Sequence, residues 1–126
     1  MKTILFIEDN LEIRENTSEI LELEGYSVLT APNGKIGFEI AQKQKPDLIL
    51  CDIMMPEMNG YEVFESLKKT VETSSIPFIF ITASAEKSEV QKGLNMGAIG
   101  YIRKPFTEKE LLDTIEDSFN EAIGES

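Results

Sequence analysis

Five short runs of apolar residues recur along the chain, and longer segments with a different spacing separate them. The runs are rich in Ile, Leu, Val and Phe, and they show little alternation between apolar and polar positions. Such continuous runs are typical of strands that are covered on both faces. We therefore expect strands at residues 3–7, 26–31, 47–51, 76–81 and 99–102.

The segments between these runs carry apolar residues at steps of three and four, which is the spacing of an amphipathic helix. We expect helices at residues 10–24, 34–44, 60–70, 85–96 and 107–121. Residues that favour helix ends support these boundaries. The candidates are Asn33, Asn59 and the Thr107–Glu110 capping box at N-termini, and Gly25 and Gly97 at C-termini.

Regular alternation of strand and helix predicts the fold class. It indicates an α/β protein with a parallel sheet, right-handed crossovers and helices on both faces. For five strands we expect the doubly wound, flavodoxin-like (βα)5 arrangement with strand order 2-1-3-4-5. The sequence contains no linker, repeat or second pattern, so residues 1–126 are expected to form one domain.

Charge and composition narrow the classes of function. Twelve Lys and Arg against 23 Asp and Glu give a formal net charge of -11, which repels nucleic-acid phosphates and acidic lipid surfaces. Direct nucleic-acid binding is therefore not expected. No apolar stretch approaches the length of a membrane span, and carboxylates interrupt the N-terminal segment too early for a secretory signal. We expect no membrane association and a cytoplasmic location.

Cysteine and histidine content restricts the chemistry further. The chain has one cysteine, Cys51, and no histidine. This excludes an internal disulfide and a multi-cysteine metal site, and it removes the usual general base. Any chemistry must come from carboxylates, hydroxyls, lysine or a bound cation.

Polar residues stand at the C-terminal ends of the expected strands. Glu8 and Asp9 follow the first strand, Asp52 the third, Thr82 the fourth and Lys104 the fifth. In the expected strand order the first and third strands are neighbours, so their carboxylates should cluster at the edge where ligands bind. Carboxylates that repel one another are tolerable when they hold a divalent cation, and Mg²⁺ typically takes one or two of them.

These groups together describe a carboxylate that receives a phosphoryl group. A cation would keep Asp52 ionised and nucleophilic near neutral pH. Lys104 would place a positive charge beside an anion on Asp52, and the Thr82 hydroxyl would donate a hydrogen bond to that anion. The metal and the lysine would then absorb the charge of the transfer, so we take Asp52 as the acceptor.

Four stretches in order resemble the receiver domain of two-component response regulators: "ILFIEDN", "LILCDIMMPEMNGYE", "IPFIFITA" and "GAIGYIRKPF". The resemblance covers the whole chain. It implies that Asp52 accepts a phosphoryl group from a histidine kinase, a histidine phosphotransfer protein or a small phosphodonor. It also implies a Mg²⁺ site at which Mn²⁺ can substitute. Its ligands would be Asp9, Asp52 and the backbone carbonyl of Met54, with Glu8 acting through water.

The resemblance assigns the remaining site residues as well. Thr82 matches a switch hydroxyl that turns toward the phosphoryl oxygens, and the small Ala83 after it leaves room for them. Tyr101 matches an aromatic residue that swings inward at the same time. Lys104 matches the phosphate-binding lysine, and the bond to Pro105 is expected to be cis.

The resemblance implies an output through residues 85–121, the face of the fourth helix, fifth strand and fifth helix, toward a downstream protein. The chain would be a monomer or a weak phosphorylation-dependent dimer, and not an enzyme beyond its own phosphorylation and autodephosphorylation. Ile99 and Gly100 depart from the acidic residues common in the family, which bears on partner selection. Met54 and Ser84 offer no group to position an attacking water, so we expect slow loss of the phosphoryl group.

Other function classes are weighed against this interpretation. A haloacid-dehalogenase-type phosphatase needs a second aspartate two residues after the first, where this chain has Met54. A flavodoxin needs a hydroxyl-rich phosphate cradle, whereas the first loop here reads "EDN". A phosphorylation-independent interaction module usually lacks the acceptor, an acidic residue or the lysine, and all of these are retained. The cognate kinase, the downstream target and any further domain stay open.

Overall fold

Residues 1–83 and 86–124 are described by the structure, a computed structural model, with side chains described up to residue 120. Strands and helices alternate along this part of the chain. The strands are β1 (Thr3–Ile7), β2 (Ser27–Ala31), β3 (Leu48–Asp52), β4 (Phe78–Thr82) and β5 (Gly100–Arg103). The helices are α1 (Leu11–Leu23), α2 (Gly34–Gln44), α3 (Gly60–Lys68), α4 (Lys87–Met96) and α5 (Glu108–Gly124).

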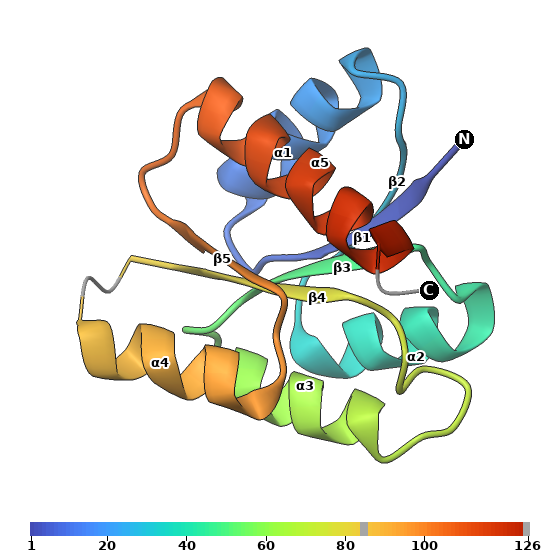
Figure 1. Cartoon of the computed structure of the whole chain (residues 1–126), viewed down its shortest axis with the longest axis vertical. Helices are drawn as coiled ribbons and strands as arrows, with labels where there is room; N and C mark the ends of the chain where they lie inside the picture. Colours follow the sequence, from blue (N-terminus) through green and yellow to red (C-terminus); the bar gives the residue numbers. More distant parts are fainter. Residues whose placement is uncertain (84–85, 125–126) are drawn as a thin grey trace.

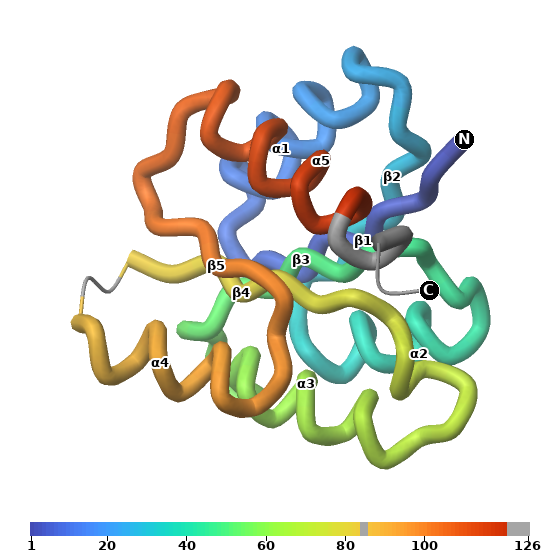
Figure 2. The backbone as a smooth tube through the Cα atoms, in the orientation of Figure 1, coloured from blue at the N-terminus to red at the C-terminus, as the bar shows by residue number. Residues whose placement is uncertain are grey.

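The strands form one parallel sheet in the order β2-β1-β3-β4-β5, which confirms the predicted topology. Helices α1 and α5 cover one face of the sheet, and α2, α3 and α4 cover the other (Figure 1). In the backbone trace of Figure 2, β1 lies beside β3 although α1, β2 and α2 separate them in sequence. The carboxyl ends of these two strands therefore meet at the same edge.

Each face of the sheet has its own apolar core. One core packs between the sheet and helices α2 and α3, and the other between the sheet and helices α1 and α5. The central strands β3 and β4 are buried along their whole length, whereas the edge strands β2 and β5 are partly exposed. Burial on both faces explains why the central runs lack alternation.

The predicted helix ends are mostly confirmed. The Asn33 side chain accepts a hydrogen bond from the first turn of α2, and Asn59 forms a full capping box with Glu62 at α3. The Thr107–Glu110 box forms through bonds of 3.1 and 3.3 Å. A cap that the sequence analysis did not single out lies at Asn10, whose side chain accepts from the third residue of α1.

Several boundaries differ from the expectation. Helix α3 ends at Lys68, two residues early, because a series of turns follows it, and β4 begins at Phe78 rather than at residue 76. Helix α5 continues to Gly124 instead of ending at residue 121. Asp52 and Thr82 are the last residues of β3 and β4, so the sheet itself holds their backbones.

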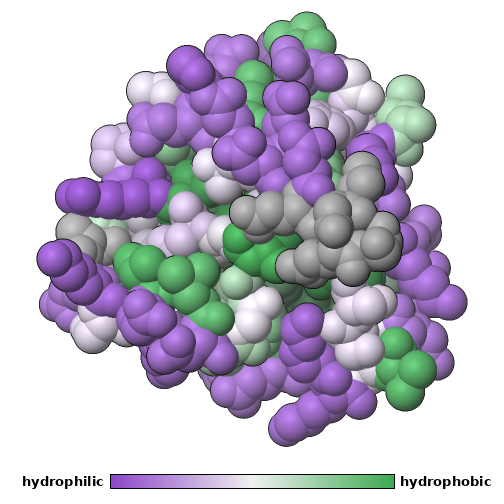
Figure 3. Space-filling model, viewed as in Figure 1, coloured by the Kyte–Doolittle hydropathy of each residue, from purple (hydrophilic) through white to green (hydrophobic). Residues whose placement is uncertain are grey.

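The surface is mostly polar, as the net charge of -11 implies. Figure 3 shows one face that is largely hydrophilic, with hydrophobic residues confined to separate patches. Scattered exposure of single apolar side chains, such as Leu23 and Val71, is ordinary for a folded chain. Within residues 1–83 and 86–124, no helix has the length and apolar character needed to cross a bilayer.

Candidate functional site

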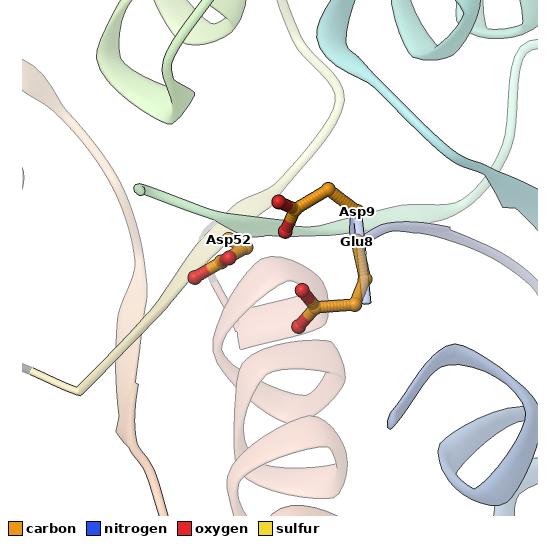
Figure 4. A group of neighbouring side chains, drawn as sticks. All are labelled: Glu8, Asp9 and Asp52. Carbon is orange, nitrogen blue, oxygen red and sulfur yellow. The ribbon is translucent and has the colours of Figure 1, made fainter. Parts of the chain in front are cut away.

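Three carboxylates gather where β1 and β3 end, as the strand order predicts. Ile7 pairs with Cys51 across the two strands, so the residues that follow, Glu8 and Asp52, reach the sheet edge at the same level. One carboxylate oxygen from each of Glu8, Asp9 and Asp52 lies within 4.8 Å of the others. Figure 4 shows the three side chains turned toward a common space. Oxygen donors grouped in this way suit a hard divalent cation.

Burial sets the electrostatics of this acidic cluster. Glu8 is fully buried and Asp52 is 4% exposed, whereas Asp9 is exposed. Burial raises the pKa of Glu8 to about 7, and the nearby Asp52 raises it as well, while a hydrogen bond from Lys104 opposes both. Burial also raises the pKa of Asp52, against the opposing charge of Lys104. The protein alone therefore compensates the negative charge of the cluster only in part.

Lys104 bridges the two buried carboxylates. Its Nζ lies 2.6 Å from Glu8 Oε1 and 3.3 Å from Asp52 Oδ1. Burial lowers the pKa of Lys104, but its hydrogen bond to Glu8 and the charges of both carboxylates raise that pKa overall. The sequence suggested a lysine directed at an anion on Asp52. The structure adds that Glu8 is the nearer partner, and nothing in the sequence pattern indicated that pair.

Hydrogen bonds fix the backbone at Lys104 and at Glu8. The Lys104 amide donates to the Thr82 carbonyl at 2.7 Å, which continues the pairing of β4 with β5 beyond the strands. The bond between Lys104 and Pro105 is cis, as the resemblance implied. At the end of β1, Arg14 Nη1 donates to the Glu8 carbonyl at 2.8 Å. The arginine is a contributor that the sequence analysis missed, because a helix-surface arginine carries no distinctive signal.

Thr82 and Ala83 lie at the same edge as Asp52. The Ile53 amide donates to the Ile81 carbonyl at 3.0 Å, so the ends of β3 and β4 are joined just before Thr82. The Thr82 side chain is fully buried, and Ala83 after it is exposed. Ser84, for which the sequence suggested an influence on phosphoryl loss, lies outside the described residues.

Tyr101 on β5 points into the protein. Its hydroxyl is buried and has no hydrogen-bond partner among the described residues. Burial raises the pKa of Tyr101 above its ordinary range, and the nearby Tyr61 raises it further. The sequence identified Tyr101 as a candidate switch residue but did not indicate that Tyr61 lies beside it.

Two consecutive methionines in the loop after Asp52 differ in exposure. Met54 is 71% exposed, whereas Met55 is buried in the core. The Gly60 amide donates to the Ile53 carbonyl at 2.9 Å, which folds the loop back onto the end of β3. Met54 follows Asp52 by two residues, so its backbone lies close in sequence to the end of β3.

Gly60 has no room for a side chain, and its replacement by alanine should be destabilising. A Cβ at this position would lie 2.6 Å from the Asp52 carbonyl oxygen and 2.8 Å from Ile53 Cα, and both are backbone atoms. We expect Gly60→Ala to lower the free energy of unfolding by about 1–3 kcal/mol. Urea denaturation followed by circular dichroism measures the change.

Gly100→Ala is the control, because its Cβ would meet only side-chain atoms, the nearest being Ile79 Cγ1 at 3.2 Å. That contact is relieved by a small side-chain shift, so the loss should be smaller than at Gly60. Equal stability of the Gly60→Ala variant and the parent protein would contradict the expectation.

The chain is similar to known proteins along almost its whole length. Residues 4–116 match the family model described as "Response regulator receiver domain". Protein PilH of Pseudomonas aeruginosa is 38% identical over 115 residues, which cover 91% of this chain and 95% of that protein. The phosphate regulon transcriptional regulatory protein PhoB of the same organism is 41% identical over 111 residues, or 88% of this chain.

Solved structures agree with these relatives. A CheY-like response regulator receiver domain protein from Methanospirillum hungatei superposes with a TM-score of 0.91 at 32% identity, over 100% of this chain and 99% of that one. Vibrio cholerae chemotaxis protein CheY4 superposes with a TM-score of 0.89 at 31% identity, over 94% and 98% of the two chains.

The relatives differ in length. The chain spans 48% of PhoB and 54% of a probable transcriptional regulator ycf29 from Porphyra purpurea, or about half of each. The match therefore concerns one domain of those proteins. In PilH and in both superposed structures the same domain fills nearly the entire chain. From the family match and these likenesses, the chain belongs to the response regulator receiver domains, the phosphorylation-controlled switches of two-component signalling.

Proposed function

We propose that residues 1–126 act as one receiver domain in which Asp52 accepts the phosphoryl group. The observation that carries this assignment is the bridge from Lys104 to both Asp52 and Glu8 at the end of the central strands. An oxygen of Asp52 forms the new bond to phosphorus. The bond from phosphorus to the donor's leaving atom breaks, and its electron pair departs with the donor.

The chain's own groups prepare this step. Lys104 is placed to move its ammonium from Glu8 toward the oxygens of an arriving phosphoryl group, because it already lies 3.3 Å from Asp52. Thr82 offers a hydroxyl from the neighbouring strand end. Donors already placed at this edge need only small side-chain movements to stabilise the charge that develops during transfer.

The acidic cluster fits a divalent cation. We assign Mg²⁺ to Asp9, Asp52 and the Met54 carbonyl as direct ligands, with Glu8 acting through water and with Mn²⁺ as a substitute. This set suits Mg²⁺, because that ion prefers oxygen ligands and takes only one or two carboxylates directly. The raised pKa values of Glu8 and Asp52 support this assignment, since a cation offsets the cost of ionising both groups. When bound, Mg²⁺ supplies positive charge to the transferring phosphoryl oxygens.

Phosphorylation would change the positions of Thr82, Ala83 and Tyr101. This change would reach the face of α4, β5 and α5, residues 85–121, where a partner protein would detect it. A histidine kinase or histidine phosphotransfer protein is the proposed donor, and a second protein the proposed target. We place the chain in the cytoplasm, as a monomer or a weak dimer. It catalyses only its own phosphorylation and slow dephosphorylation, because the exposed thioether of Met54 cannot orient an attacking water.

Acetyl phosphate tests the proposal directly. The protein, incubated with acetyl phosphate and Mg²⁺, is expected to gain the mass of one phosphoryl group in intact mass spectrometry. An excess of chelator should prevent the gain, because the acidic cluster then lacks its cation. Absence of a mass gain, or an equal gain with chelator, would overturn the Mg²⁺-dependent mechanism. After acetyl phosphate is removed, complete loss of the phosphoryl group within seconds would contradict the slow dephosphorylation.

A further inference from the structure

Three aromatic rings lie in a row between the sheet and helix α4. Tyr61 at the start of α3 packs on Phe80 of β4 with ring centroids 5.1 Å apart. Phe80 in turn lies 6.3 Å from the ring of Tyr101 on β5. This row joins three separate elements of the fold on the α3 and α4 side of the sheet.

Helix α4 packs directly on this aromatic row through Gly93. A Cβ at Gly93 would lie 2.9 Å from Phe80 Cδ2 and 3.2 Å from Tyr101 Cε2. Both distances are shorter than ordinary van der Waals contact, so the helix approaches the rings as closely as a glycine allows. The position of Tyr101 and the position of α4 therefore depend on each other.

Tyr61 is also attached to α4 by its polar end. Its hydroxyl donates to the Glu89 carbonyl at 3.4 Å, and Lys92 Nζ lies 4.3 Å from the centre of its ring. Both partners belong to α4, so Tyr61 connects that helix to the start of α3. The loop before α3 returns to the end of β3, where the Gly60 amide donates to the carbonyl of Ile53, the residue after Asp52.

The Tyr101 hydroxyl has an unmet need for a hydrogen-bond acceptor. It is buried without a hydrogen-bond partner among residues 1–83 and 86–124. Buried hydroxyls are ordinarily paired, because leaving one unpaired forfeits its bonds to water. Tyr61 and Tyr101 pack on the same ring, Phe80, and both side chains reach helix α4, so their polar ends lie on the same side of the sheet. The direction in which Tyr61 moves the pKa of Tyr101 agrees with this placement, and Thr82 acts on the same phenol in the opposite direction. A phenolic oxygen that already donates one bond can still accept another.

We propose that the Tyr61 hydroxyl is the acceptor that holds Tyr101 inward. A small shift of either ring would complete a chain of hydrogen bonds from Tyr101 to Tyr61 to the Glu89 carbonyl. Tyr61 is thus a positioning residue that couples the orientation of Tyr101 to α4. The coupling acts in the unphosphorylated protein, so it stands apart from the assignment of Asp52 as acceptor.

Fluorine NMR can test this coupling in the intact chain. The sequence holds three tyrosines and no tryptophan, so incorporation of 3-fluorotyrosine should give three resonances, each assigned by one Tyr→Phe variant. Tyr61→Phe keeps the ring that packs on Phe80 and removes only the hydroxyl. We expect this change to move the Tyr101 resonance toward its position in the unfolded chain and to increase its sensitivity to D₂O.

Two further variants separate the hydroxyl from its ring. Tyr26→Phe is the matched control, because Tyr26 packs on Phe119 in the other core, 5.9 Å between ring centroids. It should leave the Tyr101 resonance unchanged. Tyr61→Leu removes ring and hydroxyl together and should shift that resonance at least as far as Tyr61→Phe. An unchanged resonance in Tyr61→Phe, or an equal shift in Tyr26→Phe, would overturn the proposal and leave Tyr61 a packing residue only.

Discussion

Replacing Asp52 by asparagine is expected to abolish phosphoryl uptake and to stabilise the protein when no divalent cation is present. Asparagine has nearly the same shape but lacks the anionic oxygen that attacks phosphorus. The stability gain follows because the Asp52 carboxylate is buried beside Glu8 and its pKa is raised. Intact mass after treatment with acetyl phosphate and Mg²⁺ measures uptake, and urea denaturation with chelator measures stability.

The pH dependence of this gain follows from the direction of the pKa shift. A carboxyl group whose pKa is raised on folding favours the folded state below its ordinary pKa, and that contribution is lost as pH rises through the raised value. The advantage of Asp52→Asn should therefore be larger at pH 8 than near pH 4. Asp113→Asn is the matched control, since Asp113 is exposed on α5, and it should leave uptake intact. Undiminished uptake by Asp52→Asn would remove Asp52 as acceptor.

Replacing Lys104 by methionine should have the largest effect on stability. The lysine side chain is 17% exposed and is the cation that contacts both buried carboxylates. Removing one partner of a buried ion pair typically costs about 3–5 kcal/mol of unfolding free energy. The loss should be greatest at pH 8 and smaller near pH 5.5, where Glu8, with a pKa of about 7, is already largely protonated. Phosphoryl uptake by the Lys104→Met variant should also fall, because the ammonium that would contact the phosphoryl oxygens is gone.

A double variant separates charge from packing. Glu8→Gln in the Lys104→Met background removes the nearer of the two carboxylates that lost their partner. It should therefore restore part of the stability at pH 8 without restoring uptake. Lys109→Met is the control, because Lys109 forms an exposed pair with Asp113 and such pairs contribute little. If Lys104→Met proves no less stable than Lys109→Met, the Lys104 bridge does not stabilise the fold.

The fold could be predicted from the sequence because its central strands are continuous apolar runs that are easily recognised. Strands buried on both faces need continuous apolar residues, and only a few strand orders suit five strand-helix repeats. The clustering of Glu8, Asp9 and Asp52 followed from that order alone. Boundaries were less certain, as at Lys68 and Phe78, because turns and short extended segments share the same residue types as the elements beside them.

The pairings inside the site could not be predicted, because they depend on side-chain orientation. Nothing in the spacing of Lys104 indicates that it lies closer to Glu8 than to Asp52. Likewise, Tyr61 occupies an ordinary half-buried helix position, and it packs with Tyr101 around Phe80 only because of how α3, β4 and β5 come together. Such contacts are set by tertiary packing, for which a single sequence carries no local signal.

The bridge from Lys104 to Glu8 joins residues 96 positions apart, nearly the whole length of the chain. During synthesis, all three acids of the cluster leave the ribosome well before the lysine that bridges two of them. Closing so long a loop carries a large entropic penalty until the intervening strands have paired. The acidic edge is therefore assembled late, and a nascent chain cannot hold a competent phosphoryl site before its fifth strand has joined the sheet.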